Sequence, residues 1–449
     1  MKYNYIVVGG GISGLYVAYR LLQLGKGPLL VIEQSDRLGG RVFTYTDSLM
    51  SVETGAGRFK ATHHYVIQLL KELGLYSRAT KNSDKVIHYR IDDSGVSRRL
   101  QSILDYDSTR SSVTPFDITL DAAFDSISGV SLPNVGIVAR LLAAGALYSR
   151  SSLQSMTFID FAKQVVSAED VDFLLGSFGY YSELVLMNAY DCMNLMMELN
   201  PDKAFFSLRG GLSLIIDELA RRIRSMGGTI LLKKTVERIH DKERIDDKYI
   251  VSGKGIRGGA FEFSANGVVC AVTKNALERI VGLRAIVPKG LLSAPLCRVY
   301  AKYSTKHLWF RGMSKMTVNN ELRMVIPVSE KEGVIMITYT DNKFAKFWKR
   351  VLDKQGERGL ELEIKRKMYE AIGIWIPDAE EIRLFYWDYG VGYWGVGINS
   401  DEVSDRITQP FPDKSLFICG ENFSNRHQQW MEGALETGAR VIDKIVGKI

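Results

Sequence analysis

Residues 5–14 read YIVVGGGISG, and this stretch decides the fold. A short apolar strand runs into three glycines, and the next residues, SGLYVAYRLLQLG, carry apolar side chains at helical spacing. A second apolar run, LLVIE, occupies residues 29–33. Strands that are apolar throughout are typical of a parallel sheet covered on both faces. The segment therefore predicts a strand–helix–strand unit that opens a Rossmann-like α/β domain.

The turn between strand and helix has the spacing GxGxxG, at Gly9, Gly11 and Gly14. Gly9 permits a tight turn, Gly11 lets the backbone approach a pyrophosphate, and Gly14 lets the helix pack closely on the strand. The helix start at Ile12 and Ser13 adds unpaired N–H groups and partial positive charge. In this context the turn predicts a dinucleotide site, the alternative being a glycine turn without a ligand.

Two features after the second strand identify the dinucleotide. Glu33 ends that strand with Gln34 behind it, and a carboxylate there can accept both adenosine ribose hydroxyls while repelling the 2′-phosphate of NADP. A second loop with glycines between two arginines then predicts a further phosphate contact. This loop comprises Arg37, Gly39, Gly40 and Arg41. A nicotinamide site does not require it, so FAD fits better, although a solvated turn is the alternative.

Composition excludes several other classes of protein. The chain has 449 residues, 46% hydrophobic and 24% charged, which is ordinary for a folded protein. Its formal charge of +7 is spread along the chain, so we expect no nucleic-acid surface. We see no signal peptide and no membrane anchor, which makes the cytoplasm the default compartment. The four cysteines form no CxxC pair, so we expect neither a zinc site nor a disulfide framework.

The order of elements suggests two interleaved domains. Thr62 is expected to cap a helix whose apolar face ends at Leu73. A mostly helical block is expected from about 121 to 197, one strand at 229–239, and a charged helix at 359–372. We expect a discontinuous FAD-binding domain, with a second α+β substrate-binding domain formed by the insertions. The predicted FAD-binding domain comprises 1–80, 205–292 and 404–449, and the substrate-binding domain comprises 81–204 and 293–403.

The sequence resembles the flavin-containing amine oxidase family, which includes monoamine, polyamine and L-amino acid oxidases. The motifs are VVGGGISGL, Glu33, DRLGGRV, ETGAGRF, RGGLSLIIDELA, VVCAV, and FICGEN followed by QQWMEGALETGARV. The resemblance implies a GR2-type FAD domain. It also implies oxidative deamination, in which a hydride passes from the substrate to flavin N5 and reoxidation by O2 gives hydrogen peroxide.

The resemblance also implies roles for single residues. Val236 should contact adenine through its backbone, Glu421 the ribityl chain, and the N–H groups of Met431 and Glu432 the flavin pyrimidine. A helix starting near Trp430 suits this role because its positive end faces the flavin edge that becomes negative on reduction. The further cofactor contacts expected on this basis are Gly57, Arg58, Gly420 and Trp430.

Tyr393 and Trp430 match two aromatic rings that line the approach to the flavin in this family. Trp394 is the alternative to Tyr393 if the register differs by one. The family's covalently flavinylated members have a cysteine before the first ring, and Gly392 stands there in this chain. We therefore expect noncovalent FAD.

The lysine usual in the family matches Arg298, with Lys302 as a second candidate. An arginine does not readily deprotonate, which argues against a proton-transfer role at this position, and Arg298 as a plain strand residue is the alternative.

Arg58 matches an arginine that binds the substrate carboxylate in L-amino acid oxidases. A guanidinium can bond a carboxylate at two points, so an α-amino acid is favoured as the substrate, with Arg58, Tyr393 and Trp430 binding it. His63 and His64, on the helix that follows, are expected to be surface residues without a metal.

Other readings stay open. In one, the protein is a polyamine or monoamine oxidase and Arg58 is structural. In another it is a desaturase, an isomerase or a flavin-binding protein without turnover. The expected partners are a small amine or amino acid and O2, and oligomerisation is left open.

Overall fold

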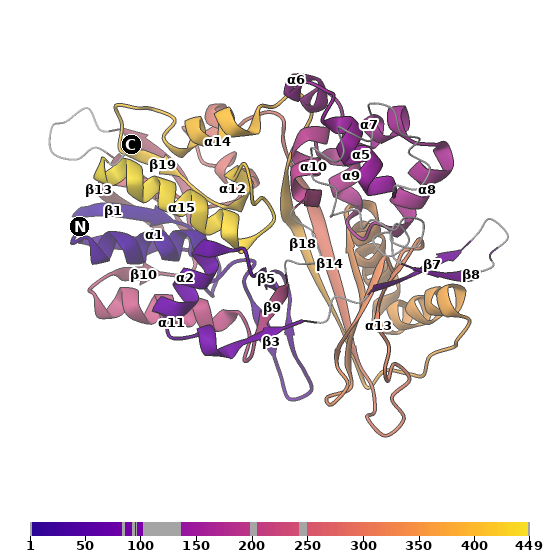
Figure 1. The fold of residues 1–449 in the computed structure, drawn as a ribbon. Helices are drawn as coiled ribbons and strands as arrows, with labels where there is room; N and C mark the ends of the chain where they lie inside the picture. Colours follow the sequence, from indigo (N-terminus) through magenta and orange to yellow (C-terminus); the bar gives the residue numbers. More distant parts are fainter. Residues whose placement is uncertain are drawn as a thin grey trace.

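The computed structural model describes residues 2–82, 86–91, 95, 97–101, 136–197, 204–241 and 249–447. Two seven-stranded sheets lie side by side, and β5 and β9 lie where they approach each other (Figure 1). The start of the predicted helical block, at 121–135, falls outside the described residues.

The first sheet confirms the predicted Rossmann-like core. Its strands run in the order β10-β2-β1-β13-β12-β11, with β19 paired to β13. β10, β2, β1, β13 and β19 are parallel, whereas β12 and β11 pair antiparallel. The bounds are β1 Lys2–Val8, β2 Leu29–Ile32, β10 Thr229–Leu231, β11 Lys234–Asp241, β12 Tyr249–Gly255, β13 Ala260–Cys270 and β19 Leu416–Ile418.

Three helices cover one face of this sheet: α1 (Ile12–Gln23), α11 (Ser213–Ser225) and α15 (Met431–Val446) (Figure 1). α1 packs between α11 and α15. The predicted apolar stripes, such as Leu15 with Leu21, are fully buried here. Segments from the start, middle and end of the chain thus share one core.

The prediction of a single strand at 229–239 is wrong, because the structure has two strands there. Lys233 has φ 59° and separates β10 from β11. That left-handed conformation cannot continue a strand, so β10 pairs with β2 while β11 turns away to pair with β12.

The predicted cap of helix α2 (His64–Glu72) is also wrong. His63, not Thr62, precedes the helix, and no neighbouring side chain caps it. Glu432 of α15 does so instead, because its carboxylate accepts hydrogen bonds from the backbone N–H groups of Tyr65 (2.9 Å) and Val66 (3.0 Å). A cap from a residue so distant in sequence ties α2 to α15.

The second sheet is antiparallel except where β15 pairs with β7. Its order is β18-β14-β17-β16-β15-β7-β8. The bounds are β7 Val86–Ile91, β8 Ser97–Gln101, β14 Leu291–Lys302, β15 Lys315–Val318, β16 Met324–Ser329, β17 Val334–Asp341 and β18 Glu381–Trp394. α13 (Asn342–Ile372) packs on this sheet and is kinked at Gly356 (φ 68°), so the charged helix predicted at 359–372 is its second part.

A block of helices lies at one end of the second sheet (Figure 1). The block confirms the predicted helical region as far as it is described, and Tyr393 of β18 joins its core. It comprises α5 Ile137–Gly145, α6 Arg150–Gln154, α7 Phe158–Val165, α8 Ala168–Ser177, α9 Tyr181–Leu186 and α10 Ala189–Met197.

The remaining elements are short. They are β3 Thr44–Thr46, β4 Ser51–Glu53, β5 Phe59–Lys60, β6 Ala79–Lys81, β9 Phe205–Leu208, α12 Lys274–Leu277, α14 Ser400–Thr408 and the 3₁₀ turns Tyr76–Arg78, Arg284–Ile286 and Glu421–Phe423.

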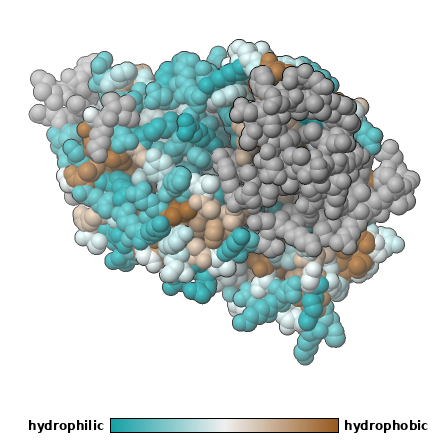
Figure 2. All heavy atoms as spheres, viewed as in Figure 1, coloured by the Kyte–Doolittle hydropathy of each residue, from teal (hydrophilic) through white to brown (hydrophobic). Residues whose placement is uncertain are grey.

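The surface is mixed. On the face seen in Figure 2, the coloured residues are mostly hydrophilic, and the hydrophobic ones form separate small patches. Among the residues that the structure describes, no helix has the length and apolar character needed to cross a membrane.

Candidate functional site

One cavity of about 420 Å³ collects most of the predicted site residues. It is lined by the carboxyl ends of β1 and β2, by the starts of α1 and α15, and by residues of β14, β17 and β18. The predicted site residues that line it are Gly9, Gly11, Ile12, Ser13, Glu33, Gln34, Gly39, Gly40, Arg41, Gly57, Arg58, Val236, Arg298, Tyr393, Gly420, Glu421, Trp430 and Met431.

Four glycines, which we call the glycine wall (Gly9, Gly11, Gly39 and Gly40), line one part of this cavity. The two loops touch, since Gly39 N donates to Gly10 O (2.8 Å) and Gly11 forms a bridge with Gly39. A Cβ on Gly11 would meet no atom within 4 Å. Open space beside a backbone that faces a cavity leaves room for a ligand's phosphates.

Gly14 plays a different part and does not line the cavity. A Cβ there would lie 2.0 Å from Gly9 O. Its role is therefore the close packing of helix against strand.

Both helices that start at the cavity lack a side-chain cap. Gly11 precedes α1 and Trp430 precedes α15, and neither makes a capping side-chain bond. Ser13 is engaged elsewhere, because its hydroxyl donates to Ala434 O (2.9 Å). Two uncapped N-termini facing one cavity supply N–H donors and partial positive charge for anionic or polar ligand groups.

Glu33 is fixed beside the glycine turn. Its Oε2 accepts from Gly10 N (2.7 Å), and its Oε1 accepts from the backbone N–H (2.8 Å) and hydroxyl (2.6 Å) of Ser35. Each carboxylate oxygen has more than one acceptor site. The residue can therefore also accept ribose hydroxyls.

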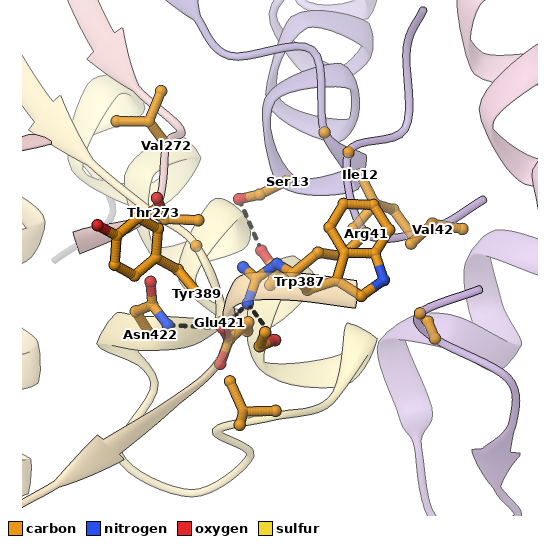
Figure 3. A pocket seen from close by; sticks show the side chains of 18 of the residues that line it. Ile12, Ser13, Arg41, Val42, Val272, Thr273, Trp387, Tyr389, Glu421 and Asn422 are labelled. Carbon is orange, nitrogen blue, oxygen red and sulfur yellow. Dashed lines mark hydrogen bonds and ion pairs between the residues drawn. The ribbon is translucent and has the colours of Figure 1, made fainter. Parts of the chain in front are cut away.

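An ion pair between Arg41 and Glu421 joins the two ends of the chain inside the cavity (Figure 3). Glu421 also accepts from Asn422 Nδ2 (2.6 Å) and Gln429 N (2.8 Å). Arg41 also donates to Gly390 O (3.0 Å). The pair thus joins the second glycine loop, the turn after β19, and β18.

Arg37 was predicted to contact a phosphate, yet it does not line the cavity. Its guanidinium donates to Leu38 O (3.1 Å) and Gly40 O (2.9 Å) and lies 4.0 Å from the Phe43 ring centroid. It therefore supports its own loop. Glu432 is also absent from the lining, because its side chain caps α2, and the predicted role of its backbone N–H stays a prediction.

Arg58 lies among aromatic rings in another part of the cavity. Its Nη2 donates to the Tyr180 hydroxyl (2.6 Å), and its guanidinium carbon lies 4.0 Å from the Phe205 ring centroid and 5.9 Å from that of Trp430. The Phe205 and Trp430 rings stack at 6.0 Å. Four aromatic residues line this part of the cavity around Arg58, and together with it we call them the aromatic wall: Tyr180, Tyr339, Tyr393 and Trp430.

The structure places Tyr393, and not Trp394, at the cavity. Trp394 is buried in the core, where its Nε1 donates to Ser424 O (2.8 Å). Gly392 packs against Asn422, so that a Cβ would lie 2.2 Å from Asn422 Nδ2. A cysteine therefore does not fit at this position without a shift.

Arg298 lines the cavity, whereas Lys302 does not. Lys302, the last residue of β14, donates through its Nζ to Glu332 O (3.0 Å). Arg298 Nη1 donates to Glu53 O (2.9 Å). Burial would lower the pKa of the Arg298 guanidinium, but Tyr300 and Tyr339 outweigh it and raise the pKa above its usual value. Arg298 is therefore a permanent cation.

His63 is buried, which corrects the prediction that it lies at the surface, whereas His64 is exposed. The His63 ring packs edge-on against Trp430 at 5.0 Å, and its Nδ1 accepts from Lys60 N (3.2 Å). Burial, then the nearby Lys60, His427 and His64, lower the pKa of His63 from 6.5 to about 2. The ring is therefore neutral at physiological pH.

This histidine should make the fold acid-sensitive. In the unfolded chain the His63 ring takes up a proton near pH 6.5, whereas in the native state it stays neutral. The free energy of unfolding therefore falls as the pH drops below 6.5. Between pH 7 and 5 the wild type should lose about 2 kcal/mol more than His63→Gln. Urea unfolding of both proteins at the two pH values tests this, and equal losses would show that His63 titrates normally.

Two buried carboxylates in the cavity were not predicted. Glu183 of α9 is 4% exposed and Asp341, at the end of β17, is 2% exposed. They share the cavity with the aromatic wall. Among the described residues no cluster of three or more histidines, cysteines or acids could hold a metal ion.

Residues 12–446 match the profile of the family described as flavin containing amine oxidoreductases. A flavin-containing amine oxidase of Oncorhynchus mykiss is 35% identical over 88 residues, which are 19% of this chain and 17% of that relative. The matching stretch thus spans less than a fifth of these curated relatives.

Other matches cover nearly the full length. Aplysianin-A of Aplysia kurodai is 21% identical over 98% of this chain and 89% of its own. A putrescine oxidase variant from a redesign of cofactor binding has a TM-score of 0.75 at 17% identity over 100% of both chains. Wild-type putrescine oxidase bound to putrescine has a TM-score of 0.73 at 16% identity over 100% of this chain and 99% of that one. At these identities the structural likeness concerns the fold.

Proposed function

The chain belongs to the family of flavin-containing amine oxidoreductases, and from that premise we propose that it is an FAD-dependent oxidase of an α-amino acid. The observation that carries the substrate proposal is Arg58. Its guanidinium lines the same cavity as Tyr393 and Trp430, and a guanidinium can bond a carboxylate at two points.

The residues present fit FAD. The open space beside Gly11 and the uncapped start of α1 suit the pyrophosphate, and Glu33 suits the adenosine ribose. Val236 would contact the adenine, Glu421 the ribityl chain, and the uncapped start of α15 at Met431 the flavin pyrimidine. The close packing of Gly392 on Asn422 supports noncovalent binding. We propose that 1–80, 205–292 and 404–449 form the FAD-binding domain, and 81–204 with 293–403 the substrate-binding domain.

When bound, FAD supplies the two-electron acceptor, because its N5 takes a hydride from the carbon that bears the amine. The protein supplies position and electrostatics. Arg58 holds the substrate carboxylate, and Tyr393 and Trp430 orient the neutral amine between their rings. Arg298 cannot serve as a base and instead adds fixed positive charge to the cavity. The imine would then hydrolyse to a keto acid and ammonia, and the two electrons and two protons removed from the substrate would reduce O2 to hydrogen peroxide.

Anaerobic reduction of the bound flavin tests the proposal. A panel of L-amino acids, monoamines and diamines is mixed with the FAD-loaded protein, and the loss of flavin absorbance is followed. We expect at least one α-amino acid to bleach the flavin, and air to restore the colour with formation of hydrogen peroxide. Bleaching by amines alone would favour a monoamine or polyamine oxidase, and no bleaching would favour a desaturase, an isomerase or a flavin-binding protein.

A further inference from the structure

Glu183 and Asp341, which we call the acid pair, lie in the cavity without a role in the proposed reaction. Asp341 Oδ2 accepts from the backbone N–H of Ser182 (2.9 Å), the residue before Glu183. Both side chains line the cavity and Asp341 acts electrostatically on Glu183, so the two carboxyl groups are neighbours, one carried by helix α9 and the other by the end of strand β17.

Each carboxylate has one buried oxygen without a hydrogen-bond partner in the protein. Glu183 Oε2 and Asp341 Oδ1 have no hydrogen-bond partner. Over the described part of the chain, no cation lies within ion-pair distance of either group. Buried carboxyl oxygens without partners are costly, so a group that enters the cavity and supplies donors would be bound strongly.

Two arginines near the acid pair donate to other groups, and the buried Lys60 also acts on Glu183 and partly offsets the rise of its pKa. Arg323 donates to the carbonyl oxygens of Leu175 (2.8 Å), Gly176 (3.1 Å) and Phe178 (2.6 Å), and gives no hydrogen bond to Asp341. Arg58 donates to the Tyr180 hydroxyl. Burial, then Asp341, raise the pKa of Glu183 well above its ordinary value, and burial raises that of Asp341 to about 6. Two neighbouring buried carboxyl groups are more stable in their charged form when a cation lies between them, so the acid pair should attract a cation that enters the cavity.

We propose that the acid pair binds a second, positively charged group of the substrate, so that the preferred substrate is an α-amino acid with an ammonium or guanidinium at the end of its side chain. The reacting amine is a poor occupant of this place. It must be neutral when the carbon that bears it loses a hydride, whereas two neighbouring carboxylates would keep it in its charged form. A metal ion is also a poor occupant, since the described residues supply two carboxylates here and no third ligand.

The inference rests on the proposed oxidase activity, and one set of four compounds separates the two. L-lysine has both the carboxylate and the terminal ammonium. L-norleucine lacks only the ammonium, cadaverine lacks only the carboxylate, and pentylamine lacks both. Two further pairs, L-ornithine with L-norvaline and L-arginine with L-citrulline, allow for a different side-chain length.

The measurements are kcat/KM and the Kd obtained by anaerobic calorimetry on the FAD-loaded protein whose flavin has been reduced beforehand, so that no substrate is oxidised during the titration. We expect at least one basic amino acid to be preferred over its uncharged partner by about 30-fold or more. Cadaverine, which carries the second ammonium, should likewise have a higher kcat/KM and a lower Kd than pentylamine, which lacks it. Equal values within every pair, in both kcat/KM and Kd, would overturn the inference.

Isosteric variants test the residues. Glu183→Gln and Asp341→Asn should each lower the preference for the basic partner by about tenfold or more. Asp191→Asn is the matched control, because Asp191 is a buried carboxylate outside the cavity whose oxygens accept from Ser400 and Asn188. It should keep the preference.

If Glu183→Gln and Asp341→Asn lower kcat/KM and weaken binding equally for all four compounds, the acid pair contacts the reacting amine and the inference is wrong. If cadaverine is oxidised and neither amino acid is, the amino-acid proposal fails while the acid pair still shows its preference for a second charge.

Discussion

Gly11→Val is expected to yield a folded chain that no longer binds FAD. Gly11 has φ −75°, so valine causes no backbone strain, and a Cβ there meets no atom of the protein. The new side chain would instead occupy the space next to the glycine wall that we assign to the pyrophosphate. Losing those contacts should weaken FAD binding by roughly 100-fold or more.

Two variants serve as comparisons for this prediction. Gly259→Val places the same side chain in open space outside the cavity and should bind FAD normally. Gly14→Val should fail to fold, because its Cβ would lie 2.0 Å from Gly9 O. Calorimetric titration with FAD and circular dichroism separate these cases. Normal FAD binding by Gly11→Val would place the pyrophosphate elsewhere.

Arg58→Met should damage the use of amino acids far more than the use of amines. Removing one partner of a buried, hydrogen-bonded charge pair costs about 2–5 kcal/mol. We therefore expect KM to rise by about 100-fold for any α-amino acid that the wild type oxidises. For the amine that lacks only the carboxylate, KM should change by about threefold or less, because that amine has no carboxylate for the guanidinium to bind.

The amine also controls for a structural effect, because Arg58 bonds the Tyr180 hydroxyl and any disturbance caused by losing that bond would affect amino acid and amine alike. Arg58→Lys keeps the charge without the two-point geometry and should give an intermediate KM. If amino acid and amine are weakened equally by Arg58→Met, the arginine is structural, as in the amine-oxidase alternative.

Local patterns predicted the nucleotide half of the fold well. The glycine spacing, the two apolar strands and the uncapped helix start are all determined within residues 2–33, and the structure confirms each element. The start of α15 at Met431 also followed from a short motif. Such features are predictable because their physics depends on neighbours in the chain.

The errors concern long-range contacts. The cap of α2 comes from Glu432, and His63 is buried against Trp430. Neither follows from periodicity, because each depends on which segments pack together. Lys233 is a different case, since nothing in its side chain signals a left-handed backbone.

The acid pair was missed for a similar reason. Glu183 stands in a mostly apolar helical stretch and Asp341 ends an apolar strand, so each looks like an ordinary surface acid. One signal was available, because a lone acid next to buried residues deserves a search for a partner. Only the fold shows that the two acids meet beside Arg58.

One binding measurement tests the central claim, that this cavity holds a single noncovalent FAD. The purified chain is stripped of any flavin and titrated with FAD, then the loaded protein is denatured and filtered. We predict one FAD per chain, with all the flavin recovered in the filtrate. A chain that takes up no FAD would contradict the account, and flavin retained on the denatured protein would contradict noncovalent binding.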